Sequence, residues 1–485
     1  MTPPRRQLGL IVTAAIVVAN MIGVGVFTST GYQAASLHDP MTILLAWVVG
    51  GVIALCGAAA YAELGSMMPK AGGEYVYLRE AYHPAVGFMS GWVSLTAGFS
   101  APIAGAAIAF AAYLATLVPA LQSNVPWAAT TIEIGSTKLA TISMGAQQAV
   151  AMTLIAAVTV LHSFDTKIGG WVQAAFTAAK VLLISLFILG GLLIGDGSWS
   201  NFASREGGLA NVGTTAFAMA LLYVSLAYSG WNAAAYIASD VEKPERNLPR
   251  ALLLGTGLVM VLYVLLNLVF LYAVPIDVLD GPTVPGKFSP VIEVGDVAAK
   301  TLFGDYAGKL VSSVIALALI SSVSAMIMAG PRVYAAMAEN RALPRPLATY
   351  NRRGVPVVAV VTQGVLGCLF VLVGDLGALI RFVSFTLAIF AALTVASVFV
   401  FRARGKRGAY RTFGYPFTPI AFIAASVWIA YAQIKENPKE SAVVGLVLLV
   451  GGAIYLATMR GKPPGDAAPP DVPEARVVSK PPDEA

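Results

Sequence analysis

The chain has 485 residues, of which 57% are apolar and only 12% are charged, and its mean hydropathy is +0.76. Soluble domains carry about 25% charged residues, so a water-soluble core is excluded and the composition predicts a protein that uses lipid as its solvent. The formal net charge of +6 is too small to suggest a nucleic-acid partner, and both cysteines fall inside apolar stretches, which argues against a disulfide framework.

Apolar stretches of about 20 residues, the length of a helix that crosses a bilayer, recur along the chain. They predict an all-α polytopic membrane protein with about 12 transmembrane helices. The helices are expected at residues 9–34, 41–67, 85–118, 146–162, 168–194, 211–239, 250–274, 306–337, 355–373, 375–400, 416–433 and 441–459.

The first stretch is interrupted by the small residues of the sequence Ile22-Gly23-Val24-Gly25. In hydrocarbon every backbone N–H and C=O needs a partner, so an unwound segment persists only where it lines a cavity or contacts protein. A helix that restarts at Val24 would aim free N–H groups and a positive dipole end into the membrane, which suits a carboxylate. Membrane glycines more often serve close helix packing, but the neighbouring Asn20 and a second interrupted stretch favour a binding site.

Lys180 lies in the middle of the fifth stretch, about 20 Å along the helix from Lys167. Snorkelling to an interface explains it poorly, and an intramembrane ionisable residue is a functional candidate by default. Its ammonium could take the place of a bound sodium ion, and because burial disfavours the charged amine it could also exchange a proton. Ser321, Ser322 and Ser324 on the eighth stretch could face the unwound first stretch, although such serines usually bond their own backbone.

The sixth stretch is interrupted at Tyr228-Ser229-Gly230-Trp231. The half-helix that ends there offers carbonyl groups, which suit an ammonium, so the two interruptions together predict a site for a zwitterionic α-amino acid. Paired interruptions in matching segments of two halves are typical of the substrate site of secondary transporters. Tyr228, Trp231 and Asn232 are expected to form a pocket wall or gate, because they lie mid-span rather than at an interface.

The Lys and Arg residues predict the orientation, because short cytoplasmic loops are enriched in them. With the N-terminus inside, the inner loops and tails hold most of the 31 Lys and Arg residues, including Arg352, Arg353 and the basic cluster at 402–411. Both termini are therefore expected in the cytoplasm, and the membrane is expected to be the cell (inner) membrane. The charges of Glu63, Glu74 and their neighbours near the inner end of the second stretch are expected to be caps and anchors.

Five stretches precede residue 200 and five follow residue 210, which predicts two repeats of opposite orientation with stretches one and six in equivalent places. The tail is rich in Pro, Asp and Glu, has no apolar period and is expected to be disordered. The predicted divisions are a cytoplasmic N-terminus at 1–8, repeats at 9–194 and 211–400, two further helices within 416–460 and a cytoplasmic tail at 461–485.

Enzyme and metal signatures are missing from the sequence. It contains no HExxH, no Ser-His-Asp set and no nucleotide-binding glycine loop after a strand. No metal and no cofactor is therefore expected, and transport is favoured over membrane-embedded catalysis.

Several stretches resemble the amino acid–polyamine–organocation superfamily, within it the bacterial relatives of the L-type amino acid transporters. The match covers about residues 5–400. Residues 22–27 read IGVGVF, like the first-helix carboxylate motif of that family, and residues 61–77 read YAELGSMMPKAGGEYVY, the most specific stretch. Residues 176–180 read FTAAK, like its fifth helix, and AYSGWNAAAYIASDVEKPERNLPRA from Ala227 resembles its sixth helix and the loop after it. Residues 324–344 resemble its eighth helix and the following loop.

The resemblance implies a leucine-transporter-type fold with five-helix inverted repeats and alternating access. By motif position, the backbone around Gly23 would meet the substrate carboxylate, and the sixth helix would meet the amino group or side chain. Lys180 aligns with the lysine that replaces a sodium site in the family, which implies sodium-independent transport. The residues expected at the substrate are Ile22, Gly23, Val24, Gly25, Leu226, Ala227, Tyr228, Ser229 and Gly230, with gate or support roles for Asn20, Trp231, Asn232, Ser321 and Ser324.

Three departures from the family pattern bear on specificity. Val24 stands where many relatives carry Ser, so one hydroxyl contact to the carboxylate is lost, and Leu226 stands where the L-type branch has an aromatic gate. No cysteine lies in an outer loop, so the family's disulfide to an accessory heavy subunit cannot form.

The sequence leaves four hypotheses open. The leading one is a sodium-independent carrier of neutral α-amino acids that works by exchange or by proton symport. The second is a polyamine or cationic amino acid permease, which predicts an acidic residue facing the pocket. The third is an amino acid sensor or channel-like membrane protein, and the fourth, an intramembrane enzyme, has no supporting set of residues.

Overall fold

The computed structural model describes residues 8–69, 73–122, 126–134, 137–164, 169–203, 208–236, 238, 241–281, 290–339, 342–373 and 376–459. The tail predicted at 461–485 and residues 1–7 of the predicted N-terminal segment lie outside this part of the chain.

Helical structure coincides with each of the twelve predicted apolar stretches in the described residues. In chain order the helices are α1 (Leu10–Met21) with α2 (Val24–Leu37), α3 (Pro40–Met67), α5 (Pro84–Val93) running through a π-helical segment (Ser94–Ser100) into α6 (Ala101–Leu117), α7 (Ala146–Phe164), α8 (Gly169–Leu193), α9 (Thr215–Ala227) with α10 (Ala233–Tyr236), α11 (Pro244–Ala273), α14 (Asp305–Glu339), α15 (Val357–Val373), α16 (Leu376–Ala403), α17 (Phe417–Glu436) and α18 (Pro438–Met459).

Eight of these helical spans are long and apolar enough to cross a bilayer, and the bent pair α1–α2 makes a ninth within the described part of the chain. Three shorter apolar helices, Thr177–Leu193, Thr215–Ala227 and Val357–Val373, occupy the remaining predicted positions. The protein is therefore an all-α polytopic membrane protein. The ninth and tenth predicted stretches, which adjoin in the sequence, are separate helices, α15 and α16.

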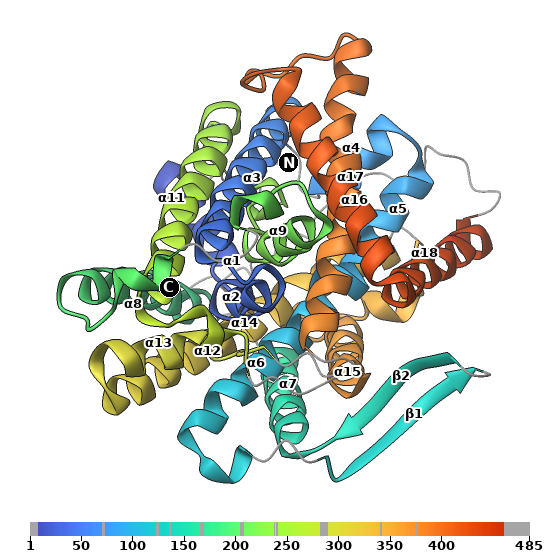
Figure 1. Ribbon diagram of the computed structural model, residues 1–485. Helices are drawn as coiled ribbons and strands as arrows, with labels where there is room; N and C mark the ends of the chain where they lie inside the picture. Colours follow the sequence, from blue (N-terminus) through green and yellow to red (C-terminus); the bar gives the residue numbers. More distant parts are fainter. Residues whose placement is uncertain are drawn as a thin grey trace, which may run out of the picture.

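The interrupted helices α1, α2 and α9 lie near the centre of the bundle, and α18 lies at its edge (Figure 1). Helix α2 packs against α9, α1 packs against α11, and α3 contacts both α9 and α11. Side chains fix where these helices begin: Asp39 caps α3 by accepting from the N–H of Thr42 at 2.8 Å, and Thr214 caps α9 by accepting from the N–H of Phe217 at 3.3 Å.

The connecting segments hold structure that the apolar pattern did not predict. An antiparallel hairpin of β1 (Ala128–Ile134) and β2 (Thr137–Met144) joins α6 to α7 and reaches away from the bundle (Figure 1). Its strands are rich in Thr and Ile, which favour extended backbone. Helix α4 (Gly73–Ala81) follows α3, and α12 (Ile276–Leu279) and α13 (Val294–Phe303) lie between α11 and α14. Short 3-10 turns occur at Pro119–Leu121, Trp199–Phe202, Gly208–Asn211 and Arg345–Ala348.

Candidate functional site

The predicted interruption of the first span is present in the structure. Helix α1 ends at Met21, α2 begins at Val24, and the two are bent by 42°. Gly23 has extended backbone, φ −139° and ψ −155°, and no side chain of the described chain caps the start of α2. The first N–H groups of α2 therefore have neither an intrahelical partner nor a side-chain cap.

Space remains beside this interruption. A β-carbon added to Gly23 would meet nothing nearer than the carbonyl oxygen of Met21 at 4.0 Å. Gly23 keeps part of its surface exposed, whereas residues 24–34 of α2 are buried. Close helix packing, the usual role of a membrane glycine, therefore does not explain Gly23.

Two side chains bind the backbone carbonyl groups at the same interruption. The carbonyl oxygen of Met21 accepts a hydrogen bond from Tyr263 Oη at 2.7 Å, and that of Ile22 accepts one from Lys180 Nζ at 3.3 Å. The unwound segment is thus fixed at its carbonyls while the N–H end of α2 stays open, as a site for an anionic group requires.

The sixth span is interrupted where the sequence predicted it. Helix α9 ends at Ala227, a turn covers residues 228–232, and α10 follows. Gly230 has φ +99°, a left-handed conformation that side chains rarely adopt. The N–H and hydroxyl of Ser229 both fold back to the carbonyl oxygen of Leu226, at 3.0 and 2.6 Å, and Tyr228 Oη donates to the carbonyl of Trp47 at 3.0 Å.

The two interruptions touch each other through backbone. A β-carbon on Gly25 would lie 2.5 Å from Cα of Ala227, and one on Gly230 would lie 2.5 Å from the carbonyl oxygen of Asn20. Close approach of two backbones therefore explains why residues 25 and 230 are glycines. The N-terminal end of α2 and the C-terminal end of α9 consequently lie at one place in the bundle.

Lys180 connects the interruption of the first span to α14. Its side chain is buried, with 2% of the residue exposed, and Nζ donates to Ser322 Oγ at 2.8 Å as well as to Ile22. Among the described residues no carboxylate pairs with it. The amine therefore links the fifth, first and eighth spans.

Two of the other residues predicted to support the site, Ser324 and Asn20, direct their side chains away from it. Ser324 bonds Nε2 of His162 on α7 at 2.8 Å instead of facing the first span, because residues two apart on a helix point to opposite sides. The side chain of Asn20 donates to the carbonyl of Ile16 in its own helix at 2.8 Å, so only its backbone reaches the sixth-span turn, at Gly230. Ser321 is buried on the same turn of α14 as Ser322.

Trp231 and Asn232, in the turn of the sixth span, contact two residues of the 61–77 stretch: Trp231 contacts Tyr61, and Asn232 contacts Glu74. The ring of Trp231 meets Tyr61 edge to face, with centroids 4.6 Å apart. Asn232 Nδ2 and Tyr61 Oη both donate to Glu74 Oε1, at 2.8 and 2.6 Å. Burial raises the pKa of Glu74, while the two hydrogen bonds oppose that rise. The sequence treated Glu74 as an interfacial anchor; in the structure it is a buried partner of the sixth-span turn.

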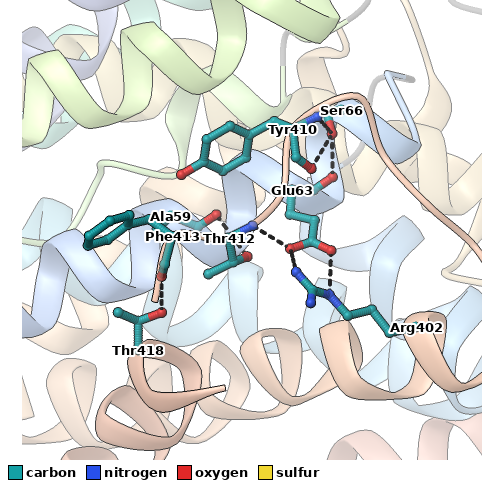
Figure 2. Close-up of polar contacts among 8 residues, drawn as sticks. All are labelled: Ala59, Glu63, Ser66, Arg402, Tyr410, Thr412, Phe413 and Thr418. Atoms are coloured by element: carbon teal, nitrogen blue, oxygen red, sulfur yellow. Dashed lines mark hydrogen bonds and ion pairs between the residues drawn. The ribbon is translucent and has the colours of Figure 1, made fainter. Parts of the chain in front are cut away.

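Glu63 of the same stretch is also buried, with 1% of the residue exposed. Arg402 of α16 donates to both of its carboxylate oxygens, at 2.8 and 2.7 Å, and the N–H of Thr412 adds a third bond at 2.7 Å (Figure 2). Ser66 Oγ lies between the carbonyl oxygens of Glu63 and Tyr410, as Figure 2 shows. This cluster fastens the segment after α16 to α3 and leaves no oxygen of Glu63 without a partner.

Metal chemistry finds no support in the described residues, where no three His, Cys, Asp or Glu side chains are grouped to hold an ion.

A polytopic helical membrane protein with two interrupted helices meeting at its centre has the architecture of a secondary transporter. A family model of amino acid permeases matches residues 8–454, and the chain belongs to that family. The resemblance seen in the sequence is therefore confirmed.

Curated relatives align over nearly the whole chain. The serine/threonine exchanger SteT of Bacillus subtilis is 27% identical over 467 residues, covering 94% of this chain and 98% of the relative. The human b(0,+)-type amino acid transporter 1 is 29% identical over 462 residues, covering 94% and 88%. The human large neutral amino acids transporter small subunit 2 is 28% identical over 471 residues, covering 93% and 80%.

Proposed function

We propose that the protein is a sodium-independent carrier that moves neutral α-amino acids across the membrane by alternating access. One observation carries this proposal: the uncapped start of α2 and the end of α9 meet beside a buried lysine. The N–H groups of Gly23, Val24 and Gly25 would bind the substrate carboxylate. The turn from Leu226 to Gly230 would receive the amino group and side chain.

The position of Lys180 supports sodium independence. The carbonyl oxygen of Ile22 and the hydroxyl of Ser322 are the kind of oxygen ligands that coordinate sodium at interrupted helices. Both already accept from Lys180 Nζ. A positive amine at that point would repel a second cation, so the lysine serves as a built-in substitute for the ion.

Neutral substrates are favoured because the two buried carboxylates of the 61–77 stretch, Glu63 and Glu74, are both engaged by other groups. Glu74 binds Tyr61 and Asn232, and Glu63 binds Arg402. The names of two relatives, a serine/threonine exchanger and a large neutral amino acids transporter subunit, point the same way.

A cationic amino acid or a polyamine is the second candidate. Its support is Glu74, the one acidic side chain that contacts Asn232 in the described structure. For such a substrate Glu74 would have to exchange a present partner for the cation.

Exchange and proton symport both remain within the proposal, with protons as a candidate co-substrate bound at Lys180. The protein would sit in the cell membrane with both termini in the cytoplasm, arranged as five-helix repeats at 9–194 and 211–400. It would work without a disulfide-linked heavy subunit, because Cys56 and Cys368 lie within the membrane-spanning helices α3 and α15 and not in an outer loop.

Uptake into proteoliposomes tests the proposal. Labelled alanine, leucine, arginine and putrescine are offered to vesicles that are empty or preloaded with substrate, in sodium or choline buffer, with or without a pH gradient. We expect leucine or alanine uptake that choline leaves unchanged and that either preloading or an imposed pH gradient accelerates. Acceleration by preloading indicates exchange, and acceleration by the pH gradient indicates proton symport. A steep sodium dependence contradicts the proposal, uptake of putrescine or arginine alone favours the second candidate, and uptake that neither preloading nor the pH gradient accelerates indicates a channel. Binding without any flux indicates a sensor.

A further inference from the structure

Helix α18 has an unexpected polar attachment to the bundle. It lies outside both predicted repeats, and only 11% of its apolar window is buried. Its first turn nevertheless carries Glu440, whose carboxylate receives two bonds from Arg381 of α16: Nε to Oε2 at 2.7 Å and Nη2 to Oε1 at 2.6 Å. This forked geometry is among the strongest that charged side chains form.

The same guanidinium reaches a third group. Arg381 Nη1 donates to Tyr223 Oη at 2.9 Å, and the Arg381 side chain is mostly buried. Tyr223 belongs to α9 and lies one helical turn before Ala227, the residue that touches Gly25. Arg381 therefore connects α18 to the interrupted helix that ends at the proposed substrate site.

The ring of Tyr223 continues this connection to α2. It stacks on Tyr32 with centroids 5.0 Å apart and planes 15° from parallel, and Ser29 Oγ donates to the carbonyl oxygen of Tyr223 at 3.3 Å. Gly25, Ser29 and Tyr32 share one face of α2, because helix residues four and seven apart align. The Gly25–Ala227 and Tyr32–Tyr223 contacts thus belong to one α2–α9 interface.

We propose that Arg381 is a positioning residue for transport, one that fixes the α2–α9 pair against α16 and α18. Through Glu440, the twelfth helix thereby controls the geometry of the substrate site, although it contributes no residue to that site. This inference rests on the proposed function, since it concerns the same site.

Three variants each weaken a different part of the Tyr223–Arg381–Glu440 connection. Tyr223→Phe deletes only the hydroxyl that Arg381 binds and keeps both the aromatic stack and the Arg381–Glu440 pair. Glu440→Gln removes the charge that holds the guanidinium but leaves Tyr223 intact. Arg381→Lys keeps a positive charge but lacks the fork needed to bridge both partners.

The test is exchange of the substrate found for the wild type, measured as KM and maximal rate in proteoliposomes, with the folded fraction followed by gel filtration. Tyr350→Phe is the matched control, because it removes a tyrosine–glutamate hydrogen bond to Glu339 far from α2 and α9. We expect Tyr223→Phe, Glu440→Gln and Arg381→Lys each to raise KM about three- to tenfold, part of the worth of a hydrogen bond to a charged group. Tyr350→Phe should keep the wild-type KM.

The double variant Tyr223→Phe with Glu440→Gln should cost no more than the larger single change, because both break one connection. A wild-type KM for Tyr223→Phe, or equal losses of folded protein and maximal rate with KM unchanged, overturns the inference. A wild type that carries no amino acid, by exchange or by symport, would instead refute the proposed function, so the two failures are distinguishable.

Discussion

Gly25 of α2 and Ala227 of α9 are in direct backbone contact, so close that a β-carbon on residue 25 would stand 2.5 Å from Cα of Ala227. No flexible side chain can move aside, because the obstructing atoms belong to the main chain. Gly23, two residues earlier, faces open space. The two glycines of the first interruption therefore serve different purposes, one in packing and one beside the uncapped N–H groups.

Gly25→Ala should disrupt the assembly of α2 on α9, whereas Gly23→Ala should fold normally. Residue 23 has an extended backbone that alanine adopts without strain, so its added methyl group would affect only a bound substrate. We expect a clear loss of monodisperse protein for Gly25→Ala, and for Gly23→Ala a wild-type melting temperature with weakened substrate affinity. Gel filtration measures the monodisperse fraction of both variants, thermal unfolding gives their melting temperatures, and exchange assays give their substrate affinities. A destabilised Gly23→Ala would show that packing governs this position too.

Lys180→Ala should leave the folded protein in the membrane but abolish exchange or remove its dependence on pH. The substitution deprives the Ile22 carbonyl and the Ser322 hydroxyl of a shared donor and leaves the unwound segment without its link to α14. Ser322→Ala removes one of these two bonds and should cost less, about tenfold in rate, the worth of one hydrogen bond to a charged group. The exposed Lys435→Ala on α17 serves as the control. Wild-type rates with an unchanged pH profile in Lys180→Ala would remove this lysine from the mechanism.

Glu63→Gln should lower the thermal stability of the purified protein. The substitution leaves the Arg402 guanidinium without its carboxylate. Breaking a fully buried ion pair from one side costs about 3 kcal/mol or more, but 25% of the Arg402 side chain is exposed to solvent, so we expect a smaller loss of about 1–2 kcal/mol. Glu80→Gln is a suitable control, because Glu80 pairs with Arg79 on a more exposed surface, where such pairs contribute little. The melting temperatures of the two variants in detergent give the comparison, and equal melting temperatures would mean that the cluster in Figure 2 adds no stability.

The sequence predicted the two interruptions correctly because small residues break apolar stretches at equivalent places in the two halves, at Gly23 and Gly25 in the first stretch and at Ser229 and Gly230 in the sixth. Lys180 was equally visible, since a charge in an apolar stretch stands out. The partners of these residues were harder to predict. Whether Ser322 or Ser324 faces Lys180 depends on the rotation of α14 about its axis, which no local pattern fixes when serines lie on several sides. The bonds of Arg381 to Glu440 and of Glu74 to Asn232 join residues remote in the chain, so only the folded bundle brings them together.

Glu74→Gln should change how stability depends on pH. Burial raises the pKa of this carboxyl above the ordinary 4.5, so the folded protein keeps the proton over a pH range in which the unfolded chain has lost it. The contribution of Glu74 to stability is therefore complete below pH 4.5 and declines as the pH rises through the raised pKa. Glutamine imitates the protonated carboxyl, accepts from Tyr61 and Asn232 in the same way and does not titrate. The melting temperature of the wild type should thus fall relative to that of Glu74→Gln as the pH increases from 4.5, whereas a constant or reversed difference would show that Glu74 is ionised in the folded protein.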